Sequence, residues 1–134
     1  MPSLFTGVGS SSESSSQTAG FRKLDNLIVI VDNNNLQIDG PITEVNSPYP
    51  IDKKFEAFNF HVINVADGND FDALRAAFKE ARGVKGMPTA IIMKTVKGKG
   101  ISFMENQVGW HGKGPNDAEY AAALAELKEA EETL

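Results

Sequence analysis

The chain has 134 residues, enough for one ordinary domain with a core of its own. Its formal net charge of −5 argues against general binding to nucleic acids or anionic membranes, since both need a basic protein surface. It has no cysteine, which excludes disulfides, thiolate catalysis and cysteine-bound metal in this sequence. No apolar run is long enough to span a bilayer, and we expect a cytoplasmic protein.

The first segment, residues 1–19, is rich in serine and contains one charged side chain, Glu13. A secretory signal would need a basic stretch followed by an apolar one, and a transit peptide would need arginines. Low-complexity serine does not bury a core, so we predict a disordered tail here. The organised domain is expected over residues 20–134.

The organised sequence opens with a predicted strand at residues 24–33, LDNLIVIVDN. Its continuous run of β-branched residues is typical of a strand covered on both faces. Pro50 is expected to open a short helix as its first residue, with Phe55 and Phe58 on one face. Residues 59–67, NFHVINVAD, predict a second strand.

A longer helix is predicted over residues 71–84, because Asp70 has the side chain of a helix N-cap. Gly83 or Gly86 is expected to end this helix. Its predicted apolar face consists of Phe71, Leu74, Phe78 and Ala81.

A third strand is predicted over residues 87–96, MPTAIIMKTV, and ends in the turn KGKG. A glycine-rich loop over residues 108–116 then leads to the last helix. Asn116 and Glu119 form a capping-box pattern at the start of that helix. Its predicted apolar face consists of Tyr120, Leu124 and Leu127.

This alternation of strands and helices predicts an α/β fold with a parallel sheet and covering helices. In such sheets, ligands bind at the carboxyl ends of the strands. Three polar clusters follow the predicted strands: DNNNLQIDG at 32–40, ADGND at 66–70, and the lysines and glycines that begin at 97. The first and third clusters form our candidate site.

The asparagines after the first strand have two interpretations. Asparagine at a strand end often makes a turn, because its side chain bonds to nearby backbone and tolerates positive φ. The alternative is a site for a hard cation such as Mg²⁺, which prefers oxygen ligands. The side-chain oxygen of Asn34 and the carbonyl of Leu36 fit adjacent corners of such a site. Spacing alone leaves both interpretations open.

The third cluster contains Lys97, Lys99, His111 and Lys113 among glycines. Glycine lets backbone N–H groups approach an anion, and lysine or histidine adds donors. The alternative is a solvated turn without a ligand. The other histidine, His61, is expected to be a partly packed strand residue.

Two stretches resemble the transketolase family. The stretch KLDNLIVIVDNNNLQIDG at 23–40 is similar to the family's KLDNLIVIVDNNGLQIDG. The stretch KTVKGKGISFMENQVGWHGKGPNDAEYAAALAEL at 94–127 is similar to the end of its thiamine diphosphate-binding domain, especially in split transketolases. The resemblance covers 20–134, leaves the serine-rich leader as unrelated, and implies three layers of the thiamine diphosphate-binding fold.

Transketolases transfer a two-carbon ketol unit between sugar phosphates, with thiamine diphosphate and Mg²⁺ or Ca²⁺ as cofactors. By resemblance, Asn34 and the carbonyl of Leu36 are metal ligands. His111 is the family histidine near the diphosphate and the reacting carbons, where it binds the cofactor, donates hydrogen bonds and shares in proton transfer. The resemblance also implies an oligomer and a partner subunit that carries the pyrimidine-binding domain, as in the C-terminal section of split transketolases.

Several family features are missing from this sequence. The Gly-Asp-Gly motif, whose aspartate is the charged metal ligand, does not occur before Val31. The chain therefore resembles a partial domain. Asn35 and Asn59 stand where the family has glycine. If these positions need a positive φ, asparagine is the least costly substitute, and we expect only a small perturbation.

These observations favour a transketolase chain that becomes active after completion by partner chains. The alternative is a non-catalytic interaction module or a truncated remnant, without metal. A dinucleotide-binding domain is disfavoured, since no glycine fingerprint follows the first strand.

Overall fold

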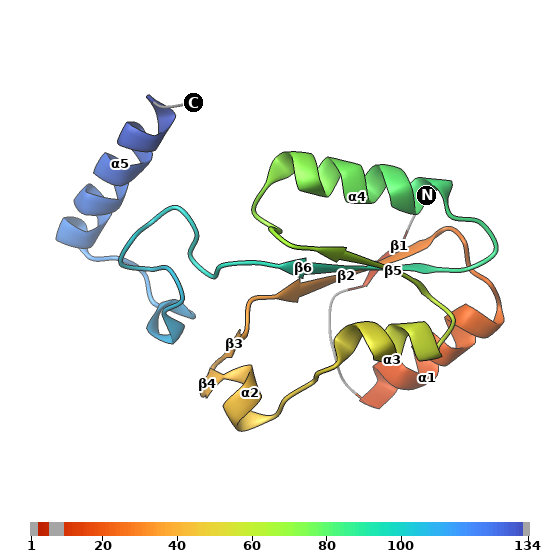
Figure 1. The fold of residues 1–134 in the computed structure, drawn as a ribbon. Helices are drawn as coiled ribbons and strands as arrows, with labels where there is room; N and C mark the ends of the chain where they lie inside the picture. Colours follow the sequence, from red (N-terminus) through yellow and green to blue (C-terminus); the bar gives the residue numbers. More distant parts are fainter. Residues whose placement is uncertain (1–2, 6–9, 133–134) are drawn as a thin grey trace. The chain divides into compact units, whose positions relative to one another are not determined.

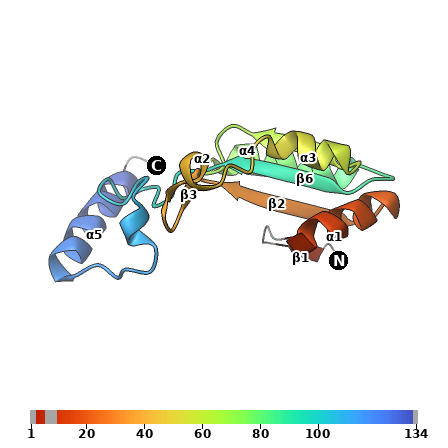
Figure 2. The same ribbon diagram turned by 90° about the horizontal axis from the view of Figure 1, so that it is seen from below.

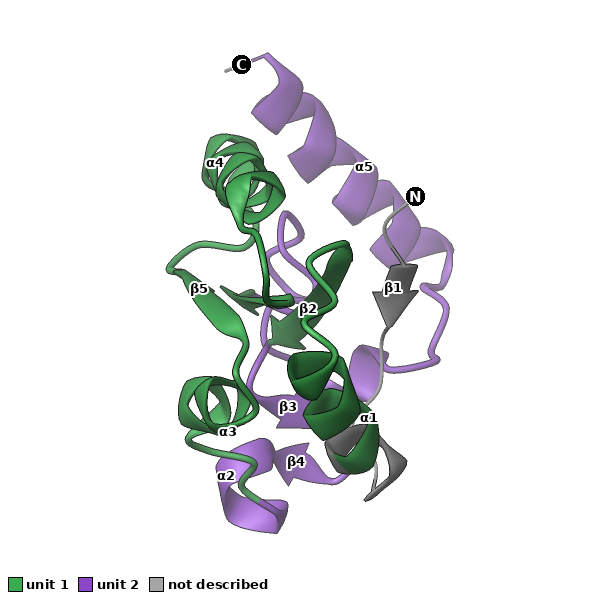
Figure 3. Cartoon of the chain, turned by 90° about the vertical axis from the view of Figure 1, so that its right-hand side faces the viewer, with its two compact units in different colours: residues 1–33, 47–95 green, residues 34–46, 96–134 purple. Residues whose placement is uncertain are grey.

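The computed structural model describes residues 3–5 and 10–132. The chain divides into two compact units (Figure 3). Unit 1 comprises residues 1–33 and 47–95, and unit 2 comprises residues 34–46 and 96–134. Among the described residues, none of the helices has the length and apolar character needed to cross a membrane.

Unit 1 is built on a four-stranded parallel sheet in the order β1-β2-β6-β5. Its strands are β1 (Ser3–Phe5), β2 (Leu27–Asn33), β6 (Thr89–Lys94) and β5 (His61–Val65). Figure 2 shows β2 and β6 side by side, with the same direction. The prediction of an α/β fold with a parallel sheet is confirmed.

Helices cover both faces of this sheet (Figure 1). Helix α4 (Phe71–Gly83) lies on one face, and α1 (Ser10–Phe21) and α3 (Ile51–Ala57) lie on the other. Two apolar clusters separate the layers, because alternate residues of each strand point to opposite faces. The α4 side buries Ile28, Ile63, Val65, Ala77, Ala81 and Ile91. The α1 and α3 side buries Ala19, Phe60 and Ala90.

The prediction of disorder in the serine-rich segment is wrong for residues 10–19, which form most of α1. Ala19 is only 4% exposed and belongs to the core. A Cβ atom added at Gly20 would lie 1.8 Å from the carbonyl oxygen of Phe58, so α1 approaches the end of α3 closely. Packing of small residues against α3 therefore orders a segment that composition alone disfavours. Residues 1–2 and 6–9 lie outside the described residues.

Most predicted helix boundaries in unit 1 are confirmed. The side chain of Asp70 accepts a hydrogen bond from the backbone N–H of Asp72 at 2.8 Å, so it caps α4. The helix ends at Gly83, one of the two predicted positions. Phe71 is 76% exposed, so its assignment to the apolar face of α4 is wrong. Pro50 is the N-cap of α3 rather than its first residue.

Unit 2 begins with a hairpin that the sequence did not suggest to us. Strands β3 (Leu36–Gln37) and β4 (Gly40–Pro41) pair in antiparallel fashion, and helix α2 (Ile42–Val45) follows. Its second segment contains a short 3-10 helix at Val108–Trp110.

The last helix of unit 2 is α5 (Asp117–Glu131), and its predicted capping box is present. The N-terminal turn is therefore fixed by two reciprocal side-chain hydrogen bonds. The residues of its predicted apolar face are all partly exposed: Tyr120, Leu124 and Leu127.

Candidate functional site

At the carboxyl ends of the central strands in unit 1, polar side chains form hydrogen bonds with one another. The hydroxyl of Thr95 donates to the carboxylate of Asp32, at the end of β2. The hydroxyl of Tyr49 donates to the side-chain oxygen of Asn33 at 2.6 Å. These groups are used within the fold, so the start of the asparagine stretch has a structural role.

The cluster after β5 also has a structural role. The backbone N–H of Gly68 donates to the carbonyl of Lys94 at 2.7 Å, which joins the end of β5 to the end of β6. A Cβ atom at this position would lie 2.7 Å from side-chain atoms of Met93 and Thr95. Glycine is therefore required for this close approach.

In unit 2, the asparagine stretch forms a tight turn. The side-chain oxygen of Asn34 accepts a hydrogen bond from the backbone N–H of Leu36 at 2.9 Å. Asn35 has a φ of 61° and Asn59 in unit 1 has 62°, so both positions at which the family has glycine adopt a positive φ. The carbonyl of Asn35 accepts from the N–H of Ile42 at 2.9 Å. The turn interpretation therefore accounts for this geometry.

The described residues do not form a complete magnesium site. No cluster of three or more His, Cys, Asp or Glu residues occurs within 3–5 and 10–132. The oxygen of Asn34 already accepts one hydrogen bond and has one lone pair left for another partner. Asp32 is the nearest carboxylate in the sequence, and it is bonded to Thr95. Two neutral oxygens are a poor set for a hard dication.

The lysine-glycine cluster forms a loop made of successive hydrogen-bonded turns. The Nζ atom of Lys97 lies 3.4 Å from Nδ1 of His111, which joins the two ends of the loop. The N–H of Asn106 donates to the carbonyl of Lys97 at 2.9 Å, and the N–H of His111 donates to the carbonyl of Val108 at 2.9 Å. The imidazole of His111 is exposed. Within the described ranges, its side-chain hydrogen-bond contact is made through Nδ1.

The other two lysines of the cluster are held by carboxylates. Lys99 pairs with Glu105 at 3.3 Å, and Lys113 pairs with Glu119 at 2.9 Å. The ammonium of Lys113 also lies 4.2 Å from the ring centre of Trp110, a cation–π distance.

The two glutamates also accept backbone hydrogen bonds. The N–H of Gly100 lowers the pKa of Glu105, with a further contribution from Lys99. The N–H of Asn116 lowers the pKa of Glu119, with a further contribution from Lys113. Both carboxylates are therefore stabilised in the ionised form.

A third carboxylate attaches α5 to the loop. Glu126 accepts hydrogen bonds from the backbone N–H of Ser102 at 2.6 Å and from its hydroxyl at 2.7 Å. These bonds lower the pKa of Glu126. The indole N–H of Trp110 donates to the carbonyl of Phe103 at 3.1 Å. Sequence reasoning missed Glu105 and Glu126, which lie at no recognisable motif position.

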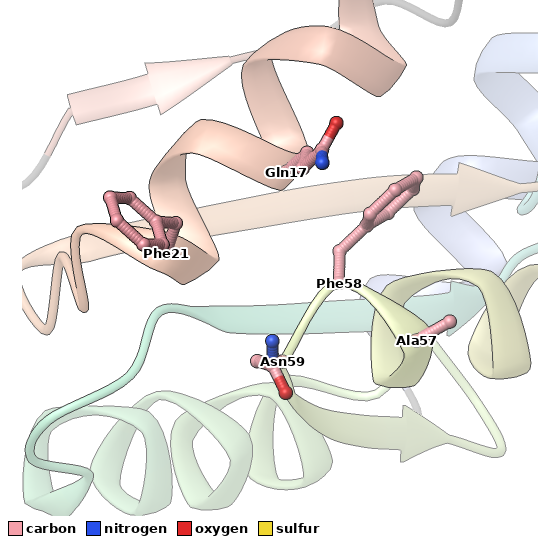
Figure 4. Close-up of a pocket in the computed structure, with 5 residues that line it drawn as sticks. All are labelled: Gln17, Phe21, Ala57, Phe58 and Asn59. Atoms are coloured by element: carbon pink, nitrogen blue, oxygen red, sulfur yellow. The ribbon is translucent and has the colours of Figure 1, made fainter.

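The three predicted site residues, Asn34, Leu36 and His111, all fall in unit 2. Within the part of the chain that the structure describes, no hydrogen bond joins Asn34 or Leu36 to His111. A hollow of about 360 Å³ lies elsewhere, in unit 1, where α1 meets the end of α3 (Figure 4). No predicted site residue lines it, so it is not the candidate site. Its lining residues are Gln17, Phe21, Ala57, Phe58 and Asn59.

Comparison with solved structures defines the class of fold. The chain superposes on a transketolase from Campylobacter jejuni with a TM-score of 0.85 and 27% identity, covering 95% of this chain and 20% of that one. It superposes on a Pichia stipitis transketolase, solved with sedoheptulose-7-phosphate, with a TM-score of 0.80 and 29% identity; the match covers 88% and 17% of the two chains. The fold is that of a transketolase thiamine diphosphate-binding domain.

The family model for the transketolase thiamine diphosphate binding domain matches residues 4–130, and the chain belongs to this family. The match starts inside the serine-rich segment, so our interpretation of that segment as an unrelated leader is wrong. The resemblance seen in the sequence is confirmed.

Two curated relatives are named as subunits of transketolases. The chain is 39% identical to the 6-deoxy-6-sulfo-D-fructose transketolase subunit SqwG of a Clostridium species, over 82% of this chain and 40% of the relative. It is also 39% identical to one of the subunits of the apulose-4-phosphate transketolase of Actinobacillus succinogenes, over 94% of this chain and 46% of the relative. The chain thus spans less than half the length of these relatives.

Proposed function

We propose that this chain supplies part of a thiamine diphosphate and divalent metal site for two-carbon ketol transfer between sugar phosphates, and that partner chains complete it. Membership of the family supports the cofactor. The names of two relatives as transketolase subunits support a multi-chain enzyme. The partner we propose carries the pyrimidine-binding domain, and a cytoplasmic location stays a prediction.

The observation that carries this proposal is the loop around Lys97 and His111. The ammonium of Lys97 has no carboxylate at ion-pair distance among the described residues, whereas Lys99 and Lys113 each have one. An exposed imidazole lies next to this cation, between Gly109 and Gly112. Such a set of donors fits the oxygens of a diphosphate or a sugar phosphate. Thiamine diphosphate, when bound, supplies the chemistry that cleaves the ketose, and the role we propose for His111 is to donate a hydrogen bond.

For the metal, we propose Asn34 and the carbonyl of Leu36 as two neutral ligands of Mg²⁺ or Ca²⁺. The remaining lone pair of the Asn34 oxygen is compatible with this role. We propose that another chain supplies the carboxylate that a hard dication favours.

The alternative is a module that keeps the fold, docks on a transketolase and binds no metal. The absence of a metal-binding cluster in the described ranges favours this alternative. The hydrogen bond between Leu36 and Asn34 also favours it, because that bond explains Asn34 as a turn residue.

Calorimetric titration with thiamine diphosphate and Mg²⁺ separates the two functions. It is run on this chain, on the pyrimidine-domain partner of a split transketolase, and on their mixture. Heat of binding by this chain alone, or in the mixture but not with the partner by itself, supports the proposed site. Absence of binding in every sample supports the interaction module.

Two histidine variants test the assigned site within the same titration. His111→Ala is expected to weaken cofactor binding by about tenfold or more, because it removes the hydrogen-bond donor that we propose for the anionic cofactor. His61→Ala is the matched control, since His61 lies in β5 and pairs with Glu80 of α4. Equal affinities of the two variants would contradict the role of His111.

A further inference from the structure

The contact between Lys97 and His111 fixes which nitrogen of the imidazole carries its proton. The Nζ atom of Lys97 lies 3.4 Å from Nδ1 of His111, a long hydrogen bond. An ammonium group has three donors and no acceptor, so Nδ1 has to be the acceptor. A neutral imidazole with a lone pair at Nδ1 carries its proton at Nε2. We propose that Lys97 is a positioning residue that holds His111 as the neutral Nε2–H tautomer.

The loop holds both partners of this contact in place. The backbone of Lys97 is bonded to Asn106, and the backbone of His111 is bonded to Val108. The indole of Trp110, the neighbour of His111, is bonded to the carbonyl of Phe103. Lys97 is half-buried, whereas His111 is exposed. Among the described residues, the one side-chain hydrogen-bond contact of His111 is at Nδ1, and the residue as a whole is exposed.

The other lysines of the cluster cannot easily replace Lys97. Lys113 is held by Glu119 and by the face of Trp110. Lys99 is held by Glu105, which also accepts from Gly100. Each of these ammonium groups would lose a charged partner if it moved to His111. Lys97 is the cation of the cluster whose partner is the imidazole.

The chain contains a second histidine as an internal reference. Nε2 of His61 lies 2.7 Å from a carboxylate oxygen of Glu80. A carboxylate only accepts, so His61 also carries a proton at Nε2. The two histidines thus have the same protonated nitrogen for opposite reasons. An acceptor at Nε2 fixes His61, and a donor at Nδ1 fixes His111.

The consequence for chemistry rests on the proposed function and deepens it. As the Nε2–H tautomer, His111 presents a donor to solvent beside the cation of Lys97. Both groups then donate to an oxygen of a phosphate or of a sugar. The opposite tautomer would present a lone pair at Nε2, which repels such an oxygen. Lys97 therefore makes a neutral histidine suitable for an anionic ligand.

Long-range ¹H–¹⁵N spectra of the histidine side chains test this inference on the full chain without cofactor or partner. They are recorded at an alkaline pH at which the ¹⁵N shifts themselves show both rings in the neutral form. A blocked histidine in the same buffer provides the unconstrained tautomer mixture. We expect His111 in the unmodified chain to show several-fold less Nδ1–H form than this reference. A mixture equal to the reference would overturn the inference, and this comparison needs no variant.

Variants then assign the effect to Lys97. In Lys97→Met, which keeps the chain length and removes the donor, the Nδ1–H form of His111 should rise to the reference level. Lys97→Arg should restore the original spectrum. Lys99→Met is the matched control and should leave His111 unchanged. An unchanged His111 in Lys97→Met, with His61 and Trp110 signals intact, would overturn the inference.

The spectra and the cofactor titration test separate claims, and either claim can fail without the other. Loss of thiamine diphosphate binding with a fixed tautomer would remove the proposed function and leave the role of Lys97. Binding of the cofactor together with an unconstrained tautomer of His111 would support the proposed function and overturn the role of Lys97.

Discussion

Each of the two units is stabilised internally by a different kind of interaction. In unit 1, three layers bury two apolar clusters, and Ile91 at the centre of the sheet is fully buried. In unit 2, Ala123 is the one buried apolar residue of the described part of the chain. Carboxylates that accept backbone N–H bonds instead order its loop and α5. Glu105 bonds to Gly100 within the loop, Glu119 bonds to Asn116 at the start of α5, and Glu126 joins α5 to Ser102 of the loop.

Because of this difference, the apolar core that stabilises the sheet and the residues of the candidate site lie in different units. Apolar burial does not depend on ionisation, whereas a carboxylate that accepts N–H bonds holds its partners best in the ionised form. The predicted site residues all lie in the unit with few buried apolar side chains. Site geometry should therefore be lost under conditions that leave the sheet intact.

The largest expected effect is in the core of unit 1. Ile91→Ala should lower the free energy of unfolding by about 2–5 kcal/mol, because it leaves a cavity in the central strand. Urea denaturation followed by circular dichroism measures this loss. Ile38→Ala is the matched control, as Ile38 is 70% exposed in unit 2, and its effect should stay within about 0.5 kcal/mol. Equal effects would contradict the contrast between the units.

The second effect tests whether the serine-rich helix belongs to unit 1. Gly20→Ala places a Cβ atom 1.8 Å from the carbonyl oxygen of Phe58 and should cost about 1–3 kcal/mol in unfolding free energy. Gly83→Ala is the control, because no atom lies within 4 Å of the added Cβ. Urea denaturation of both variants makes the comparison. A neutral Gly20→Ala would restore the prediction of a disordered leader.

Sequence patterns predicted the parts of the fold that depend on local signals. The strands around β2, β5 and β6 followed from their β-branched runs, and the caps Asp70 and Asn116 followed from side-chain chemistry. Helix α1 did not, because its serine-rich sequence lacks an apolar face and Ala19 packs only through tertiary contact. Phe71 was misplaced, since helical spacing does not show where the core ends.

The candidate site was predicted less completely. The glycine that Asn35 replaces indicated that asparagine is tolerated if the position has a positive φ, and the structure shows that it does. The contact between Lys97 and His111 joins residues 14 positions apart, so only the folded loop brings them together. Glu126 accepts a hydrogen bond from Ser102, which lies 24 positions away, and it belongs to no recognisable sequence motif. Long-range pairs of this kind depend on the fold and not on local pattern.

A smaller effect is expected on acidification. Backbone hydrogen bonds lower the pKa of Glu105, Glu119 and Glu126 from the ordinary value of 4.5. Their contribution to stability is therefore complete above this value and is lost as the pH falls through the lowered pKa values. Unit 2 should lose its order in this window, below pH 4.5, before the sheet of unit 1 unfolds.

The single tryptophan makes this acid transition measurable. Trp110 lies in the loop of unit 2, with its ring centre 5.5 Å from that of Phe103. Its fluorescence reports unit 2, and circular dichroism is dominated by the helices and sheet of both units. On titration from about pH 6 to pH 3, we expect the fluorescence change at the higher pH. Coincident transitions would show that the two units unfold together.

The smallest effect isolates one carboxylate of unit 2. Glu126 uses one oxygen for the N–H of Ser102 and the other for its hydroxyl. Glu126→Gln keeps the shape of the side chain and removes its charge. The amide oxygen still accepts from the N–H of Ser102 and the NH₂ group can donate to the Ser102 hydroxyl, so two charge-assisted bonds become weaker neutral ones. The urea midpoint followed by Trp110 fluorescence should fall, and the acid transition should become shallower. Glu129→Gln removes an exposed charge from the same helix and controls for net charge. If both variants shift the midpoint equally, general electrostatics explains the effect; a shift confined to Glu126→Gln shows that one side chain attaches α5 to the loop.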